Sequence, residues 1–314
     1  MAYFHPDLAA ARFIPSISFG PRLAALARRG TPRVAQAPDD IIVEDLRVPG
    51  PEGAPEVELR SYRPRGAAAV TPALLWIHGG GMIIGNHLSD QPGNISFARE
   101  LGITVFSVKY RLAPDNPALA AIEDVYAAFR WLSAHAAELG IDPARIAIGG
   151  ASAGGGLAAG TTLLAHDSDG PVPIFQLLVY PMLDDRTVNR TDHHVKGVRL
   201  WTKRSNRYAW SAYLGKAAGG SSVSDYAAPA RRSNLADLPP AWIGVGTNDL
   251  FHDEDVRYAE RLRAAGVSCE LMVVDGAFHG FDIVMANKNI SRTFWQAQVA
   301  ALSNAFDARS NENE

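Results

Sequence analysis

The sequence predicts an α/β fold in which one mainly parallel sheet is covered by helices on both faces. Short β-rich runs alternate with helical segments from about residue 41 to residue 306, as expected for strands joined by right-handed helical crossovers. A glycine-rich turn joins a strand to a helix at residues 149–155. Polar residues also follow directly after several predicted strands, where ligand chemistry collects in such sheets.

The predicted elements follow the chain in a regular order. Residues 1 to about 40 mix apolar and basic residues and are broken by prolines, which favours short covering helices. Strands are predicted at 41–48, 57–62, 73–77, 103–108, 145–148, 175–180, 241–245 and 269–274. Helices are predicted near 95–101, 118–139, 157–164, 254–265 and 290–306. The alternation stops between about 185 and 225, as in a helical insertion, and the polar tail after Arg309 is expected to be disordered.

Length and composition fit an ordinary globular protein. The chain has 314 residues, of which 47% are hydrophobic and 20% are charged, and its net charge is -3. This charge balance gives no global basic field to hold nucleic acid or an anionic membrane surface. The basic residues between Arg199 and Arg207 are expected to form a solvated helix face.

Cysteine use and the first residues indicate the compartment. Cys269 is the only cysteine, which excludes an intramolecular disulfide, and it is expected to be a small buried hydrophobe. No stretch approaches the ~18 consecutive apolar residues of a membrane span. Residues 1–10 lack the basic region and apolar core of a secretory signal. A cytoplasmic location is therefore the expected default.

The turn at residues 149–155 reads Gly-Gly-Ala-Ser-Ala-Gly-Gly and places Ser152 at its apex. Gly150 to Gly154 fit the G-x-S-x-G pattern, in which a strained turn lifts a serine hydroxyl above the edge of a sheet. Small residues are needed because a larger side chain at so sharp a bend would strike the neighbouring strand or helix. Taken alone, a glycine-rich turn with an incidental serine explains the pattern equally well.

A nucleophilic serine needs a base within hydrogen-bond reach, and the base needs a carboxylate that holds its tautomer. Ser152, Asp249 and His279 occur in the chain order nucleophile, acid, base. His279 lies in a loop after the last predicted strand, although a solvent-exposed loop histidine is the alternative interpretation. Asp249 is preferred to Asp253 because residues 253–255 open a helix, where acids favour the N-terminal dipole on their own account.

The segment from His78 to Gly81 predicts an oxyanion hole. Consecutive glycines let backbone N–H groups approach a substrate without a Cβ in the way, so Gly80 and Gly81 are expected to donate together with Ala153. His78 is expected to buttress this loop. The alternatives are a flexible loop or a phosphate cradle, but no P-loop lysine and no G-x-G-x-x-G pattern accompany it.

No cofactor or metal is predicted. His193, His194 and His252 lack partners at metal-ligand spacing and are interpreted as surface or cap residues.

Aromatic residues in the insertion point to a substrate pocket. Trp201, Tyr208, Trp210 and Tyr213, with Phe4, Phe13 and Ile14 from the N-terminal segment, are expected to roof a pocket above Ser152. Met82, Trp201 and Trp210 are the expected substrate contacts. The alternative is that these aromatic rings only pack the insertion against itself.

These motifs, in this order, resemble the hormone-sensitive-lipase-like family of α/β-hydrolases, which are bacterial carboxylesterases with an H-G-G-G oxyanion motif. The resemblance runs from about residue 41 to residue 306 and includes 78–81, 110–114, the serine turn, 180–185, 227–231, 249–254 and 279–281. It implies an α/β-hydrolase fold with one domain over residues 1–314. A helical cap formed by about 1–40 and about 185–225 would cover an acyl pocket. The resemblance also implies hydrolysis of short to medium acyl esters without a cofactor, and it suggests a homodimer.

Two departures leave the substrate open. Ala151 stands where the family often has aspartate or threonine, and Asp115-Asn116-Pro117 replaces the commoner Glu-His-Pro. The predicted function is a serine carboxylesterase that passes through an acyl-enzyme. An amidase or a lactone or carbamate hydrolase is the alternative on the same machinery. A non-catalytic ligand-binding relative is the alternative from another class, but such proteins typically lack one triad member.

Overall fold

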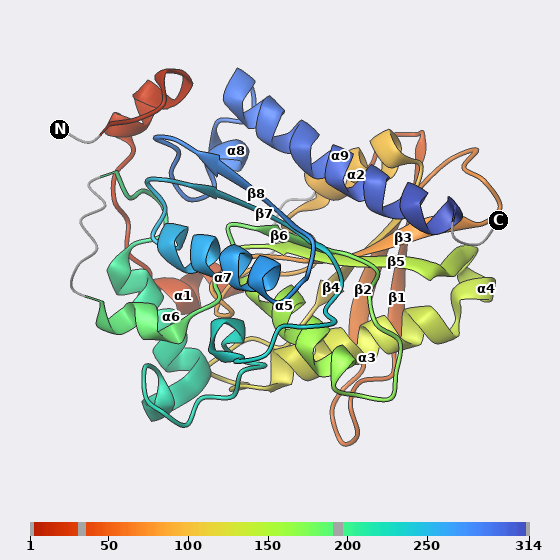
Figure 1. The fold of residues 1–314 in the computed structure, drawn as a ribbon, viewed down its shortest axis with the longest axis horizontal. Helices are drawn as coiled ribbons and strands as arrows, with labels where there is room; N and C mark the ends of the chain where they lie inside the picture. Colours follow the sequence, from red (N-terminus) through yellow and green to blue (C-terminus); the bar gives the residue numbers. More distant parts are fainter. Residues whose placement is uncertain (1–2, 31–35, 191–196, 312–314) are drawn as a thin grey trace.

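Eight strands form one sheet in the order β1-β2-β4-β3-β5-β6-β7-β8 (Figure 1). The computed structural model describes residues 3–30, 36–190 and 197–311. The strands are β1 (Ile41–Val48), β2 (Val57–Pro64), β3 (Thr71–Ile77), β4 (Thr104–Lys109), β5 (Ile141–Ala151), β6 (Gln176–Val179), β7 (Ala241–Gly246) and β8 (Cys269–Val274). β2 pairs antiparallel with β1 and β4, and all other neighbours are parallel. The predicted strands and the mainly parallel sheet are therefore confirmed.

Helices cover both faces of this sheet, as Figure 1 shows. They are α1 (Pro21–Arg29), α2 (Gln91–Leu101), α3 (Ala120–Ala134), α4 (Ala136–Leu139), α5 (Ala153–His166), α6 (Lys203–Leu214), α7 (His252–Ala264), α8 (Phe281–Val284) and α9 (Asn289–Asn311). Short 3-10 helices lie at η1 (Pro6–Phe13), η2 (Asp185–Asn189), η3 (Gly215–Ala217) and η4 (Pro229–Arg231).

Alternate side chains of β3 enter two separate cores, as the pleat of a strand requires. Leu75 and Ile77 pack in one core with α3, α5 and α7, whereas Leu74 and Trp76 pack in the other with α2 and α9. Both faces of the central strands are thus buried, which explains why these strands read as continuous apolar runs.

Two predicted boundaries were wrong. The helix predicted over 118–139 is two helices, because α3 ends at Ala134 and α4 begins at Ala136. His135 lies between them, and its Nδ1 lies 3.0 Å from the carbonyl oxygen of Trp131. The tail predicted to be disordered after Arg309 continues α9 as far as Asn311. Residues 312–314 lie outside the described residues.

The N-terminal segment contacts the insertion that carries α6, and α1 lies beside α6 in Figure 1. Ser18 Oγ lies 2.8 Å from Thr202 Oγ1, and the Phe19 N–H donates to Ser205 Oγ at 2.9 Å. The Phe19 ring also lies 6.2 Å from the Trp201 ring, measured between centroids. Two segments far apart in the sequence therefore form one layer.

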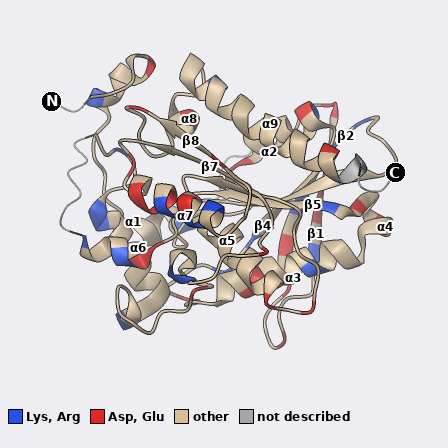
Figure 2. Cartoon of the chain, in the orientation of Figure 1, with Lys and Arg blue, Asp and Glu red and all other residues tan. Residues whose placement is uncertain are grey.

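Charged residues are scattered over many elements (Figure 2). Lys203, Arg204 and Arg207 are exposed on α6, which confirms the predicted solvated face for these three residues. Arg199 was wrongly included, because it lies before α6 and its Nε donates to the carbonyl oxygen of Ala11 at 2.9 Å. Cys269 is buried as predicted, and burial raises the pKa of its thiol to about 11. Each helix in the described part of the chain is too short or too polar to cross a bilayer.

Candidate active site

Ser152 lies in a sharp turn between β5 and α5. Its backbone has φ 58° and ψ -121°, a conformation that is costly for a residue with a side chain. Three backbone hydrogen bonds hold it, because the Ser152 N–H donates to Val179 O at 2.8 Å and the Ser152 carbonyl accepts from Gly156 and Met182 at 3.1 and 2.9 Å. The surrounding chain therefore fixes the strained serine in place.

The glycines on either side of Ser152 are required by close backbone contacts. A Cβ on Gly150 would strike the backbone of Gly154, and a Cβ on Gly154 would strike the carbonyl of Ile77. Small residues are therefore needed here because the backbone of β3 and the first turn of α5 lie too close to the serine turn to leave room for a Cβ, as the sequence predicted.

Strand register brings three predicted residues to one edge of the sheet. β5, β6, β7 and β8 are parallel neighbours, so their carboxyl ends meet at the same edge. Ser152 follows β5, Asp249 follows β7 and His279 follows β8. His279 Nε2 lies 2.9 Å from Ser152 Oγ, and His279 Nδ1 lies 2.8 Å from Asp249 Oδ2. All three side chains are buried.

Two aromatic rings hold the imidazole of His279. The Tyr180 ring lies edge-on at 4.7 Å and the Phe251 ring edge-on at 5.2 Å, between centroids. The Phe251 N–H also donates to Asp249 Oδ1 at 3.0 Å. Neither ring was predicted, although Tyr180 lies within the quoted 180–185 motif. These contacts restrict both the imidazole plane and the carboxylate.

The neighbouring acids have other partners. Asp253 accepts from Arg190 Nη2 at 2.8 Å and is exposed by 44%. Glu254 is buried, accepts from the N–H groups of Leu183 and Asp184 at 2.8 and 3.1 Å, and also bonds Thr187. Glu254 was predicted to open a helix, and it also lies in the quoted 249–254 motif. Its buried contacts join α7 to the segment after β6, and no sequence pattern signals them.

The loop 78–81 passes directly beside the serine turn because Ile77 on β3 pairs with Gly150 on β5. Gly80 and Gly81 have φ of 111° and 61°, which glycine adopts most readily. Within the described residues, no group accepts the N–H of Gly80 or Gly81. Ala153 begins α5, so its N–H lacks an intrahelical partner. These three N–H groups are the free donors that the sequence predicted for this loop and turn.

His78 packs beneath this loop. Its ring stacks on Tyr110 at 4.2 Å, and its Nδ1 lies 2.7 Å from the carbonyl oxygen of Gly79. The Tyr110 hydroxyl donates to the His78 carbonyl at 2.9 Å. Burial lowers the pKa of His78 to about 4, although the Gly79 carbonyl opposes this shift. His78 is therefore a neutral supporting residue near neutral pH.

The three predicted substrate contacts are all buried in one core. Met82, Trp201 and Trp210 are exposed by 1%, 4% and 0%. The Trp201 ring packs against Gly81, because a Cβ there would strike it. Trp210 packs 6.2 Å from the ring of Tyr213, between centroids. Trp201 thus joins the insertion to the glycine loop, whereas Trp210 packs within the insertion.

Other predicted residues do not join the site. The Phe13 side chain is exposed by 81%, so it does not roof a pocket in this arrangement. His252 lies 2.8 Å from Asp253 at the start of α7. His193 and His194 lie outside the described residues. Among the residues that the structure describes, no cluster of His, Cys, Asp or Glu is arranged to hold a metal ion.

Comparison with known proteins identifies the family of this chain. A protein-family profile described as alpha/beta hydrolase fold matches residues 74–283, which include the glycine loop, the serine turn and His279. The chain belongs to the α/β-hydrolase fold family. The resemblance drawn from the sequence motifs is thereby confirmed.

Three relatives of this α/β-hydrolase are enzymes by name. The carboxylic ester hydrolase LipN of Mycobacterium tuberculosis is 39% identical, in a match that covers 76% of this chain and 64% of LipN. The esterase LipI of the same organism is 37% identical over 87% of this chain and 85% of LipI. The solved structure of a bacterial heroin esterase is similar to this chain with a TM-score of 0.88 and 39% sequence identity. The match covers 96% of this chain and 98% of the heroin esterase chain.

Proposed function

We propose that the protein is a serine carboxylesterase in which Ser152 is the nucleophile. The observation that carries this proposal is the unbroken hydrogen-bonded series from Asp249 through His279 to Ser152, next to free N–H donors. An activated nucleophile requires this arrangement of acid, base and hydroxyl. The relatives named as esterases support the choice of a carboxylic ester as substrate.

In the proposed mechanism, Ser152 Oγ attacks the ester carbonyl carbon while His279 Nε2 takes the hydroxyl proton. Asp249 accepts from His279 Nδ1, which fixes the tautomer and stabilises the imidazolium. The N–H groups of Gly80, Gly81 and Ala153 stabilise the oxyanion of the tetrahedral intermediate. His279 then protonates the departing alcohol, and water releases the acyl group by the same steps in reverse order.

The proposed substrates carry short to medium acyl chains, and no cofactor takes part. Residues 1–40 and 185–225 would form the cap over the acyl pocket, which the contacts between Phe19, Trp201 and Gly81 support. A cytoplasmic location and a homodimer stay predictions from the sequence. Sedimentation velocity of the purified protein tests the second of these.

Rapid mixing with p-nitrophenyl butanoate tests the proposed chemistry. A burst of nitrophenol equal in amount to enzyme, with a butanoyl adduct on Ser152 by mass spectrometry, is expected from an acyl-enzyme. Ser152→Ala should lower kcat by about 10⁴-fold or more, since alanine suits a small-residue turn but offers no nucleophile. Undiminished turnover by folded Ser152→Ala protein contradicts the proposal. Faster turnover of matched amides or lactones than of esters would favour the alternative hydrolases.

A further inference from the structure

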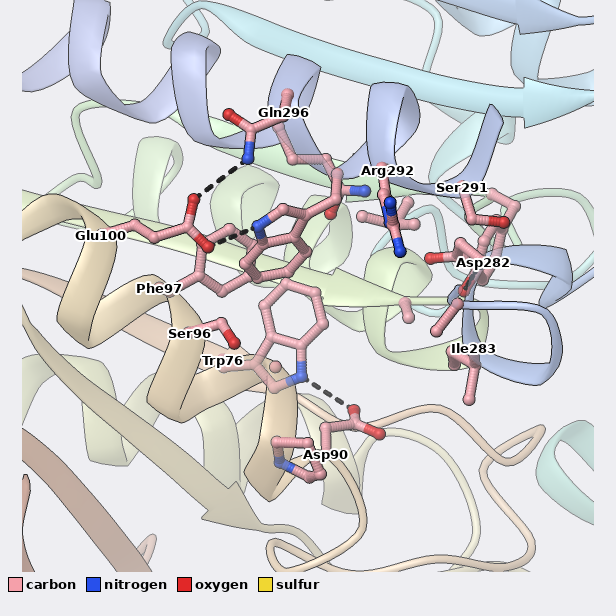
Figure 3. Close-up of a pocket in the computed structure, with 18 of the residues that line it drawn as sticks. Trp76, Asp90, Ser96, Phe97, Glu100, Asp282, Ile283, Ser291, Arg292 and Gln296 are labelled. Carbon is pink, nitrogen blue, oxygen red and sulfur yellow. Dashed lines mark hydrogen bonds between the residues drawn. The ribbon is translucent and has the colours of Figure 1, made fainter. Parts of the chain in front are cut away.

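A cavity of about 700 Å³ lies between α2, α8 and α9, with Trp76 of β3 on its wall (Figure 3). Ala151 and Tyr180 also line it. Ala151 directly precedes Ser152, and the Tyr180 ring packs against His279. The cavity therefore lies one residue from the proposed nucleophile and against a ring that contacts the proposed base, and nothing in the proposed mechanism uses it.

The wall of the cavity is aromatic. Trp76, Phe97 and Trp295 line it and pack in series, with centroid distances of 5.6 Å and 4.2 Å between successive rings. Aromatic rings attract organic cations through their electron-rich faces and cover the apolar carbons of such groups.

Two half-buried carboxylates share this cavity with the rings. Trp76 Nε1 donates to Asp90 Oδ2 at 2.8 Å, and no other described residue donates a side-chain hydrogen bond to Asp90. The Tyr180 hydroxyl donates to Asp282 Oδ1 at 3.0 Å. Burial raises the pKa of Asp282 to about 6 and raises the pKa of Asp90, which means that each carboxylate lacks part of the solvation it has in water. A cation in the cavity would replace that solvation.

An unused polar group lies in the same wall. Ser291 lines the cavity, is exposed by only 2%, and its Oγ has no hydrogen-bond partner among the described residues. Buried hydroxyls are normally paired. This oxygen is enclosed within the wall, so a ligand amine would bond it only after a change of the Ser291 rotamer.

We propose that this cavity binds a protonated amine on the alcohol portion of the ester, held by Asp282, Asp90 and the aromatic wall. The inference rests on the proposed function. The alcohol side is assigned because the departing oxygen must lie near His279 to receive its proton. Tyr180 contacts both His279 and Asp282, so it lies between the base and this carboxylate, and the proposed alcohol would pass along Tyr180 to reach the cavity. The small side chain of Ala151 leaves room beside this path.

The remaining charges of the cavity suit this assignment. Glu100 accepts from Trp295 and Gln296 at 2.8 and 3.2 Å and adds negative charge at the exposed end of α2. Arg292 is the cation among the lining residues, and it projects from α9 into the view of Figure 3. Its side chain is exposed and forms no ion pair within 4.0 Å in the described residues. Arg292 would therefore repel a bound cation. Removing its charge should increase the preference for a cationic substrate, whereas removing an Asp charge should decrease it.

The test compares two esters of equal shape and different charge. The 2-(dimethylamino)ethyl ester of butanoic acid carries a protonated amine, and 3-methylbutyl butanoate has carbon in place of that nitrogen. The ratio of their kcat/KM values at pH 7.5 is measured for the wild type, with Ser152→Ala protein as the blank for spontaneous hydrolysis. We expect a preference of about tenfold or more for the charged ester.

Variants that remove single charges then test whether the preference for the charged ester depends on this cavity. Asp282→Asn and Asp90→Asn should each bring the ratio toward one, whereas Arg292→Gln should raise it. Glu138→Gln is the matched control, because Glu138 is an exposed acid on α4 outside the cavity and its loss should leave the ratio unchanged.

A wild-type ratio near or below one, with normal hydrolysis of the neutral ester, overturns the amine site and leaves the esterase proposal intact. A preference that survives both Asp variants also overturns it. Failure to hydrolyse either ester overturns both proposals together.

Discussion

At the scale of single residues, two acids four positions apart have different surroundings. Asp249 contacts His279, whereas Asp253 is half-exposed and contacts Arg190. Asp249→Asn should lower kcat by about 10⁴-fold, because the amide favours the wrong imidazole tautomer. Steady-state kinetics with p-nitrophenyl butanoate measures this effect.

Asp253→Asn is the matched control for that change. It removes one carboxylate from the same segment and should leave kcat within about threefold of the wild type, since Asp253 does not contact His279. A larger loss for Asp253→Asn than for Asp249→Asn would show that the acid had been assigned to the wrong residue.

Gly81 tests the glycine loop at the same scale. A Cβ there would meet the rings of Trp201 and the side chain of Ala209, and φ of 61° disfavours any other residue. Gly81→Ala should therefore lower the free energy of unfolding by about 1–3 kcal/mol and kcat by about 10²-fold, as the loop N–H groups move.

Gly20→Ala serves as the control for a glycine substitution. Gly20 has φ -136° and open space around its Cα, so urea unfolding and kcat should both stay close to wild type. Wild-type kcat in Gly81→Ala protein would contradict the proposed oxyanion role of this loop.

At the scale of elements, the strands were predictable because both of their faces are buried and they read as apolar runs. Boundaries that depend on tertiary contacts were not predictable, such as the break at His135 between α3 and α4. The buried hydrogen bonds that join distant segments were not predictable for the same reason. The partners of Glu254 lie 67 to 71 residues away in sequence, and no local pattern connects them. That Ser152, Asp249 and His279 lie close together was predictable, because each follows the end of a strand at the same edge of the sheet.

The loop after β3 should make stability depend on pH. His78 stays neutral in the folded protein down to its lowered pKa of about 4, whereas the unfolded chain binds a proton near the ordinary value of 6.5. Between these values the unfolded state holds more protons, so the free energy of unfolding falls as pH drops. The His78 contribution to this loss should reach about 3 kcal/mol by pH 4.

Urea unfolding of wild-type and His78→Gln protein from pH 7 to pH 4 measures this contribution. The variant should start less stable, because it loses the contact with Tyr110, but its stability should fall less steeply below pH 6.5. Parallel pH curves for the two proteins would show that His78 is not held neutral by the fold.

At the scale of the whole molecule, the order of strands in the sheet turns three distant residues into one site. β5, β7 and β8 all end at one edge, and β6 separates Ser152 from Asp249 by one strand. The N-terminal segment and α6 then meet beside the glycine loop through Phe19, Trp201 and Gly81. The sheet thus brings the three side chains together, and in the proposed enzyme the two outlying segments would limit the substrate.

Acyl-chain preference tests that division of roles. Each buried methylene contributes about 0.8 kcal/mol of binding until the pocket is full. Since Trp201 and Trp210 are already buried in packed surroundings, a long chain would have to displace a ring. kcat/KM for p-nitrophenyl esters should therefore rise from acetyl to butanoyl or hexanoyl and then fall toward dodecanoyl.

Trimming a ring should move this optimum. Trp201→Ala and Trp210→Ala should each shift the maximum to longer chains, although each also costs about 3–5 kcal/mol of stability. Trp242→Ala is the matched control, because Trp242 is equally buried but lies in the core with α2 and α9, so its loss should lower stability without moving the optimum. A wild-type profile that still rises at dodecanoyl would indicate an open groove. An optimum unmoved in both Trp201→Ala and Trp210→Ala protein would show that these rings hold the insertion together and do not bound the acyl pocket.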